Sequence, residues 1–430
     1  MRANPPIRGW KSWQSYGGGL NEDNALANAR VQADRLLAFG YDHFCIDGGW
    51  MSDTDSVGRG MLRLDPHARY LPSRTYFPRG LSYIAGKVHE LGLKFGLHIM
   101  RGIARCAVRD NLPIEGAGLR ARDIAVTTST CSWSDQCYGV DVSQPAGRAY
   151  YDGVFDLLAS WGVDFIKADD LVPYPDEIEA ILASISRAEK KHGRTIRLSL
   201  SPGNVVLWDH MPTYHPAAAL RITPDLWDRR ADLERSFDAL ASFTTATHGA
   251  PRSVWPDLDM IPFGHLQLGL PADAIPPGQP EPFEGTERWC QFTPDQKRSY
   301  LTLRALACSP LLLGGALVDL PDDDIALLTQ PDLLACHDHP RVATPILRTG
   351  QLEVWRKSSG HTTWLGVFNR HEVARTVRLP ATTLEVPLGS PMSEVWTDRP
   401  ARWQGDDLPL NLGPDGVGFL KIVRKKTVDS

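Results

Sequence analysis

The stretch WGVDFIKADDLVPYPDEIEA, residues 161–180, contains the pattern on which the fold of this chain depends. A short apolar run from Asp164 to Asp169 stands between two segments whose apolar residues recur every three to four positions, which is a helical spacing. The first of these segments ends at Trp161 and the second begins at Pro175. A short strand between two helices is typical of a parallel β/α unit, so the stretch predicts one such unit.

The same alternation repeats from residue 8 to about residue 335, with helical patterns at 24–39, 81–91, 147–161, 175–190, 233–245 and 293–306. Eight parallel strands with outer helices close into a barrel, so we expect an α/β fold with a (β/α)8 TIM barrel over residues 1–335. The eight strand candidates are Arg8–Trp13, His43–Trp50, Lys94–Met100, Asp164–Asp169, Ile196–Leu200, Leu220–Thr223, Arg252–Asp259 and Leu311–Val318.

The sequence pattern changes after about residue 340. Apolar and polar residues alternate there, and the turns contain glycine, proline and asparagine. This alternation predicts a small C-terminal antiparallel β-sandwich domain over residues 340–430. Residues 270–288 hold five prolines without helical spacing, which predicts a long surface loop near the barrel mouth. The C-terminal strand candidates are 352–355, 363–368, 376–379 and 418–422.

Composition and charge narrow the class of protein. The formal net charge of −5 gives no basic excess, so neither nucleic acid nor an anionic membrane is an expected partner. No apolar run approaches the roughly 18 residues that cross a bilayer, and the N-terminal residues lack the apolar core of a secretory signal. We therefore expect a cytoplasmic protein that acts on a neutral small molecule, with a C-terminal domain that offers a surface for homo-oligomer contacts.

Seven cysteines, at positions without metal-type pair spacing, are an odd number. This predicts that most of them are buried apolar thiols. Cys131 and Cys137 flank a short loop, so a disulfide between these two is the alternative, although such bonds are rare in a reducing compartment.

Acidic residues follow four of the expected strands. They are Asp47, Asp169, Asp225 and Asp259. In a parallel barrel the carboxyl ends of the strands lie on one face, where active sites form. A single acid after a strand can equally cap the next helix, but four strands that end in this way favour a shared site.

Two kinds of chemistry use several carboxylates at a barrel mouth, namely divalent-metal catalysis and cleavage of a glycosidic bond. Lys167 alternates with Asp169 on one strand, so both side chains point the same way, and Arg221 lies close to Asp225. Such cations repel a metal and keep a carboxylate ionised. The pattern favours a glycosidase without metal or other cofactor. A metal-dependent lyase or isomerase and a sugar-binding protein without turnover stay as alternatives.

Six motifs follow one another along the chain: WKSW (10–13), CIDGGW (45–50), GLKFGLH (92–98), WGVDFIKAD (161–169), RITPD (221–225) and WPDLDM (255–260). As a set they resemble the motifs of glycoside hydrolase family 27, which contains α-galactosidases and α-N-acetylgalactosaminidases. The resemblance runs through all eight expected strands, and that family also has a small C-terminal β domain. It implies a retaining exo-α-glycosidase acting on a glycoside or an oligosaccharide.

Carried over by position, the resemblance implies that Asp169 is the nucleophile and Asp225 the general acid/base. Retention of configuration requires their carboxyl groups to lie about 5 to 5.5 Å apart. Lys167 is expected to hold Asp169 ionised, and Asp225 to be the more enclosed of the two acids and to titrate higher.

The resemblance also implies a sugar pocket. Trp13 matches an aromatic wall that covers the apolar face of the ring, although a plain core tryptophan is the alternative. Asp47 matches an acid that grips the outer hydroxyls, and Arg221 and Asp259 match residues near the 2-position.

Several positions depart from the family pattern. The second acid after strand two is Gly48 here, and the usual tyrosine of strand three is His98. Loss of that carboxylate leaves substrate hydroxyls unpaired, so either His98 or Arg101 must bind them or the sugar must differ. A buried structural role for His98 is the alternative.

The fifth strand ends at Ser201, where α-galactosidases have a glutamate that contacts the 2-hydroxyl. A serine leaves room for a 2-acetamido group, although it can equally cap a helix. α-N-acetylgalactosamine, β-L-arabinopyranose and an α-glucan end are therefore alternatives to galactose. The family disulfide from the position of Cys106 cannot form, because its partner position is Leu171.

Overall fold

The computed structural model of the chain describes residues 5–53, 62–247, 254–268 and 286–423. Its larger part is a parallel sheet of eight strands in the order β10-β9-β8-β7-β3-β2-β1-β13. The backbone of Ile261, after β10, hydrogen-bonds to Leu312 and Gly314 of the β13 segment, which closes the sheet into the expected barrel. The strands are β1 (Arg8–Lys11), β2 (His43–Ile46), β3 (Lys94–Met100), β7 (Phe165–Asp169), β8 (Arg197–Leu200), β9 (Ala219–Arg221), β10 (Trp255–Asp257) and β13 (Leu311–Leu313).

All eight predicted barrel strands are present, but several are shorter than predicted at their carboxyl ends. The strand β2 stops at Ile46 and β10 stops at Asp257. Gly49 (φ 95°) and Asp259 (φ 68°) have left-handed backbone conformations, which do not continue a strand. The acids that the sequence places at strand ends therefore lie in the first turns of the mouth loops. Residues 252 and 253 of the seventh candidate lie outside the described residues.

Helices cover the outside of the barrel, and α7 shows how the sequence forms them. Ile178, Ile181 and Ile185 are buried at helical spacing. Acids begin the helix, basic residues end it and Gly193 (φ 61°) terminates it in the left-handed conformation. The helices at the six predicted positions are α2 (Glu22–Arg35), α3 (Leu81–Glu90), α6 (Pro145–Ser160), α7 (Pro175–His192), α9 (Arg230–Ala246) and α10 (Pro294–Ala307).

Two connections differ from a plain β/α repeat. Between β8 and β9 the chain forms only the short elements η3 (Gly203–Val205), η4 (Trp208–His210) and α8 (Met211–Tyr214), since prolines at 202, 212 and 216 prevent a long helix. Between β3 and α6 lie α4 (Arg105–Asp110), α5 (Ala121–Ile124) and a small antiparallel sheet of β4 (Ile103–Ala104), β5 (Ala125–Thr130) and β6 (Cys137–Val140). Two further helices, α11 (Asp322–Leu328) and α12 (Pro331–Asp338), follow β13.

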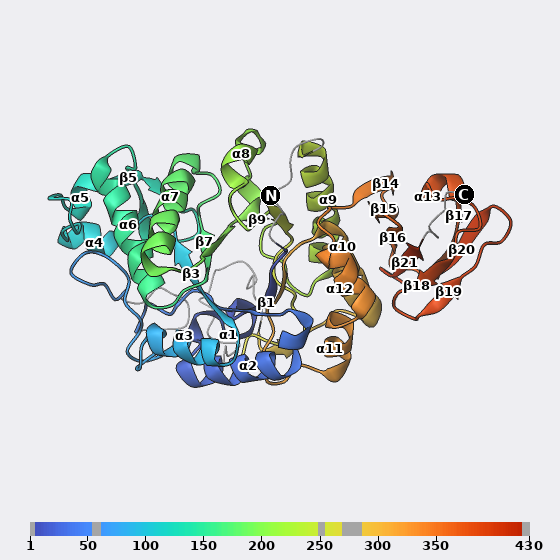
Figure 1. Cartoon of the computed structure of the whole chain (residues 1–430), viewed down its shortest axis with the longest axis horizontal. Helices are drawn as coiled ribbons and strands as arrows, with labels where there is room; N and C mark the ends of the chain where they lie inside the picture. Colours follow the sequence, from blue (N-terminus) through green and yellow to red (C-terminus); the bar gives the residue numbers. More distant parts are fainter. Residues whose placement is uncertain (1–4, 54–61, 248–253, 269–285, 424–430) are drawn as a thin grey trace.

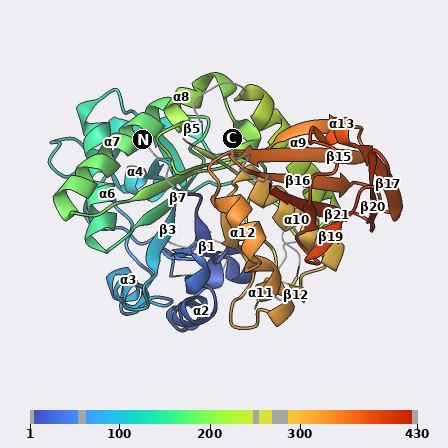
Figure 2. The same cartoon turned by 45° about the vertical axis from the view of Figure 1, so that its right-hand side comes forward.

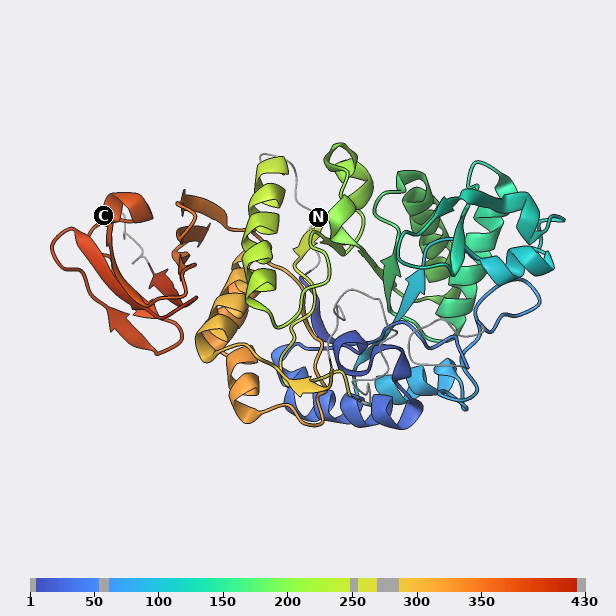
Figure 3. The same ribbon diagram turned by 180° about the vertical axis from the view of Figure 1, so that it is seen from behind.

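The C-terminal strands stand beside α9, α10 and α12 at one end of the molecule (Figure 1), as the view from behind also shows (Figure 3). They form two antiparallel sheets, with orders β14-β15-β16-β21-β18-β19 and β17-β20. The strands are β14 (Thr344–Arg348), β15 (Leu352–Ser359), β16 (Thr362–Asn369), β17 (Arg375–Pro380), β18 (Met392–Glu394), β19 (Arg399–Ala401), β20 (Asp407–Leu412) and β21 (Val417–Val423). The predicted fold class is confirmed; the limits 1–335 and 340–430 remain a prediction.

The larger C-terminal sheet is buried on both faces, because residues that are adjacent along a strand pack into two different hydrophobic cores. Val354 and Val367 pack in a core of the C-terminal sheets, whereas Trp355 and Phe368 pack with the barrel core. The ring of Phe368 lies 4.9 Å from that of Phe237 in α9. Figure 2 shows these strands running alongside α9 and α10.

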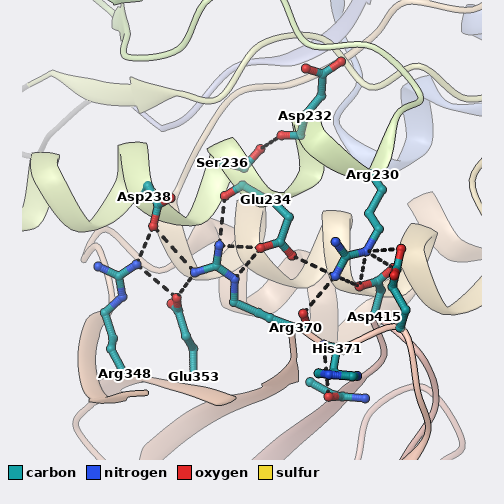
Figure 4. A network of polar contacts seen from close by, with 12 residues as sticks. Arg230, Asp232, Glu234, Ser236, Asp238, Arg348, Glu353, Arg370, His371 and Asp415 are labelled. Carbon is teal, nitrogen blue, oxygen red and sulfur yellow. Dashed lines mark hydrogen bonds and ion pairs between the residues drawn. The ribbon is translucent and has the colours of Figure 1, made fainter. Parts of the chain in front are cut away.

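Ion pairs also join α9 to the C-terminal strands (Figure 4). Arg370, after β16, binds Glu234 of α9 at 2.5 Å and also pairs with buried Glu353 of β15. Arg230, at the start of α9, lies 3.0 Å from Asp415. The helix that follows the Asp225 loop is therefore held to the C-terminal sheets by both charge and packing.

All seven cysteines are free, so the Cys131–Cys137 disulfide alternative is wrong. Five of them are buried, which confirms the prediction of apolar thiols.

Within the described ranges, no helix has the length and apolar character needed to cross a membrane. The predicted 270–288 loop lies largely outside the described residues. Its last residues, from 286, lead into the short β12 (Arg288–Trp289), which pairs with β11 (His265–Leu266).

Candidate active site

The carboxyl ends of the barrel strands bring the predicted residues together. His98 lies on β3 directly beside Lys167 on β7, as the register of these parallel strands sets. Lys167 and Asp169 are two residues apart on β7, so their side chains share the inner face. The other members stand at or just beyond the ends of β2, β8, β9 and β10, and they are Asp47, Ser201, Arg221 and Asp259.

The Lys167 ammonium lies between two carboxylates. Its Nζ is 3.1 Å from Asp47 Oδ2 and 3.3 Å from Asp169 Oδ2, and its side chain is only 5% exposed. Burial alone would raise the pKa of both acids, but the ammonium outweighs it and the pKa of each lies below its usual value. The pKa of Lys167 is raised in return, against the effect of its burial. Both acids are therefore ionised at neutral pH.

Asp169 receives two further hydrogen bonds. His98 Nε2 lies 2.9 Å from Asp169 Oδ2, and the Ser201 side chain also donates to this carboxylate. Together with Lys167 they hold the pKa of Asp169 well below its usual range, although burial opposes this. Three elements of the barrel thus fix one carboxylate, whose side chain is still 17% exposed and open to a ligand.

A second ion-pair group lies next to the first. Arg221 is buried; its Nη2 lies 3.0 Å from Asp259 Oδ2 and also pairs with Asp225. Its Nη1 donates to Ser201 Oγ at 3.4 Å, so Ser201 connects this group to Asp169. The Asp225 side chain is 40% exposed, compared with 17% for Asp169, so the expectation that Asp225 is the more enclosed acid is wrong. It lies in the loop between β9 and α9.

Trp13, Gly48 and His98 form one wall of the cluster. A Cβ atom added at Gly48 would lie 3.4 Å from Trp13 Cζ3 and 3.6 Å from His98 Nδ1. The indole of Trp13 is partly exposed, unlike those of Trp10 and Trp50 in the core. The alternative that Trp13 is a plain core tryptophan is therefore wrong. A methyl group at position 48 would therefore be in van der Waals contact with both the indole and the imidazole.

Arg101 does not join the cluster. Its guanidinium donates to Asp170 Oδ2 at 2.9 Å and to Glu177 Oε1 at 2.6 Å, and it stacks 3.5 Å from the centre of the Tyr174 ring. Of the two residues considered for the missing hydroxyl contacts, only His98 lies at the site. The Arg101 backbone N–H donates to the Asp169 carbonyl oxygen at 2.9 Å, so this arginine supports the chain around Asp169.

Two residues of the first motif contribute to the site although they were not singled out in the sequence. Ser12 Oγ accepts a hydrogen bond from the Asp47 backbone N–H at 2.9 Å. Lys11 is buried and helps to lower the pKa of Asp47, after the larger effects of burial, which raises it, and of Lys167 and His98, which lower it. The available signal was the place of both residues in the WKSW motif, next to Trp13. Among the residues that the structure describes, no group of three or more histidine, cysteine or acidic side chains is arranged to hold a metal ion.

Comparisons with known proteins extend over nearly the whole chain. No protein-family model matches it. The α-galactosidase A of Cellvibrio japonicus is 24% identical over 370 residues, which cover 84% of this chain and 74% of that relative. Human α-galactosidase A is 23% identical over 398 residues, which cover 86% and 75%. The solved structure of a family 27 β-L-arabinopyranosidase from Geobacillus stearothermophilus is 32% identical, with a TM-score of 0.89 over 100% of this chain and 98% of that one.

Proposed function

Because the chain belongs to glycoside hydrolase family 27, we propose that it cleaves a terminal galactose-configured sugar from a glycoside with retention of configuration. The observation that carries this proposal is the pair of acids Asp169 and Asp225, joined through Ser201 and Arg221. One acid is held ionised by an ammonium, and the other is open to solvent. Double displacement needs this division between a nucleophile and a proton donor.

Asp169 is the nucleophile in this proposal. Its carboxylate is ionised at neutral pH, and Lys167, His98 and Ser201 fix its orientation. It attacks the anomeric carbon and forms a covalent glycosyl-enzyme as the bond to the leaving oxygen breaks. Asp169 loses its negative charge when this covalent bond forms, so its attraction to Lys167 weakens. Lys167 stays paired with Asp47.

Asp225 is the general acid and then the base. In its protonated form it gives a proton to the leaving oxygen, and it later takes a proton from the water that releases the sugar. Its greater exposure allows contact with the aglycone and with water. Retention requires its carboxyl group about 5 to 5.5 Å from that of Asp169, which remains a prediction.

Trp13, Asp47, Arg221 and Asp259 are the sugar-binding residues. Asp259 Oδ1 and Arg221 Nε are buried and have no hydrogen-bond partner among the described residues. Buried polar atoms are costly without a partner, and the hydroxyl groups of a sugar supply both donors and acceptors. The indole of Trp13 offers an apolar face for the C–H groups of the ring.

Two substrates are candidates, because relatives named α-galactosidases and a β-L-arabinopyranosidase both match the chain. These sugars share the configuration of the ring and differ in the exocyclic CH2OH group, which arabinopyranose lacks. Gly48 favours the arabinopyranoside, because the acid that the family resemblance implies at this position, a partner for outer hydroxyls, is missing.

The test is hydrolysis of p-nitrophenyl glycosides by the wild type, Asp169→Ala and Asp225→Ala. The panel contains the α-galactoside, β-L-arabinopyranoside, α-N-acetylgalactosaminide and α-glucoside. We expect cleavage of one of the first two by the wild type and at least a thousandfold loss in Asp169→Ala. Azide should rescue Asp169→Ala with an inverted glycosyl azide and Asp225→Ala with a retained one. Rescue products of the opposite configurations would exchange the two roles, and no cleavage of any member would refute the proposal.

A further inference from the structure

One ring nitrogen of His98 makes a hydrogen bond, and the other has no partner among the described residues. The residue is 6% exposed on β3, and its Nε2 lies 2.9 Å from Asp169 Oδ2. Trp50 Nε1 donates to the His98 backbone carbonyl at 2.8 Å, which fixes the strand at this point. The Nδ1 atom is buried and has no hydrogen-bond partner in the part of the chain that the structure describes. A buried polar atom of this kind requires an explanation.

The contact with Asp169 decides which nitrogen carries the proton. Asp169 is ionised, so its oxygen accepts and His98 Nε2 donates. When the ring carries a single proton, this proton is on Nε2, and the other nitrogen, Nδ1, is an acceptor. The charged groups around the ring are Asp169, Asp47 and Lys167, and Lys167 binds both acids. The matching ligand for Nδ1 is a hydrogen-bond donor without charge.

His98 Nδ1 lies beside Gly48. The position of a Cβ atom at Gly48 lies 3.6 Å from His98 Nδ1 and 3.4 Å from the Trp13 indole. The unpartnered acceptor therefore lies close to the Trp13 indole, which the proposed function makes the aromatic wall of the sugar pocket.

Resting on the proposed function, we propose that His98 Nδ1 accepts a hydrogen bond from one hydroxyl group of the bound sugar while Nε2 holds the nucleophile. The imidazole offers an acceptor beside position 48, for a hydroxyl group that both candidate sugars carry. It also links recognition of the sugar to the orientation of Asp169, because both hydrogen bonds use one rigid ring. His98 is thus a specificity residue on one edge and a positioning residue on the other.

Two substitutions separate the two roles. His98→Gln keeps a donor near the Nε2 position and loses the acceptor at Nδ1, so we expect KM to rise about tenfold and kcat to fall less than threefold. His98→Asn keeps a polar atom near Nδ1 and loses the contact with Asp169, so kcat is expected to fall at least tenfold with a smaller change in KM. His371→Gln, a histidine in the loop after β16 of the C-terminal sheets, is the matched control.

The hydroxyl is identified with monodeoxy analogues of the p-nitrophenyl glycoside that the wild type cleaves best. We expect one analogue to lower kcat/KM of the wild type about tenfold and that of His98→Gln less than twofold. The inference is overturned if every analogue affects both enzymes equally, or if both His98 variants lose kcat and KM in the same way. A wild type that cleaves the parent glycoside but shows no such coupling refutes this inference alone. A wild type that cleaves no glycoside of the panel refutes the proposed function and this inference with it.

Discussion

Replacing Lys167 by methionine removes an ammonium that lies 3.1 Å from Asp47 and 3.3 Å from Asp169. Methionine has a similar length, so the packing at this 5%-exposed position changes little. Removing one partner of a buried ion pair costs about 3–5 kcal/mol, because the remaining charge is left without compensation. Two carboxylates lose their partner here, so the upper part of that range is expected, which is a large share of a typical unfolding free energy of about 5–15 kcal/mol.

In Lys167→Met the contribution of these two acids to the free energy of unfolding should depend on pH in the opposite direction from the wild type. In the wild type the pKa of Asp169 is depressed, so its contribution to stability is complete above the unfolded pKa, about 3.9, and is lost as the pH falls through the folded value. In Lys167→Met the largest attraction that lowers the pKa of both acids is gone, and we expect burial, the largest effect on each, to raise these pKa values. The variant should therefore become more stable as the pH falls from 7 towards 5, and the acidic limb of its kcat/KM profile should move to higher pH.

Urea unfolding followed by tryptophan fluorescence, together with pH–rate profiles, measures both effects. With a slope near 3 kcal/mol per M, the urea midpoint at pH 7 should fall by about 1–2 M. Lys94→Met is the control, since Lys94 pairs with Asp42 at the surface and its loss should cost less than about 1 kcal/mol. A midpoint within about 0.3 M of the wild type and an unmoved acidic limb would refute the reasoning.

Three further predictions follow from the contacts around the site. Glu353→Gln leaves Arg348 and Arg370 without their buried carboxylate, so the free energy of unfolding should fall by about 2–4 kcal/mol while KM stays within twofold; an unchanged urea midpoint would contradict this. Arg101→Lys replaces the two guanidinium nitrogens that donate to Asp170 Oδ2 by a single ammonium, so kcat should fall at least tenfold with little change in KM; equal rates in a steady-state assay would show that this support is dispensable. Dialysis against a chelator should leave the hydrolysis rate unchanged, because Lys167 and Arg221 already neutralise the clustered acids; a loss that a divalent metal restores would contradict this prediction.

The order of elements could be read from the sequence because barrel strands and helices bury apolar residues with different periods. The run from Lys94 to Met100 is reproduced residue for residue as β3. Helix α7 was equally readable, since its isoleucines, its acidic first turn and Gly193 are all local signals. The acids after the strands were also readable, because the carboxyl ends of parallel strands must share one face of a barrel.

Other features depend on residues that are far apart in the chain. His98 binds Asp169 across 71 positions, and only the register of β3 and β7 makes this pair. Arg101 looked free to bind a ligand, but the fold places Asp170 and Glu177 around it. The exposure of Asp225 depends on how its loop lies after β9, and no local pattern encodes that.

The sequence by itself therefore determined the barrel, the C-terminal sheets and the set of acids, since these follow from local periodicity and from the direction of parallel strands. The tertiary structure decided which acids form an ion pair with the Lys167 ammonium and which acid is open to solvent. It also decided which ring nitrogen of His98 has no partner among the described residues. These properties depend on distances of a few ångströms between side chains from different strands, because Coulomb energies and hydrogen bonds change steeply over that range.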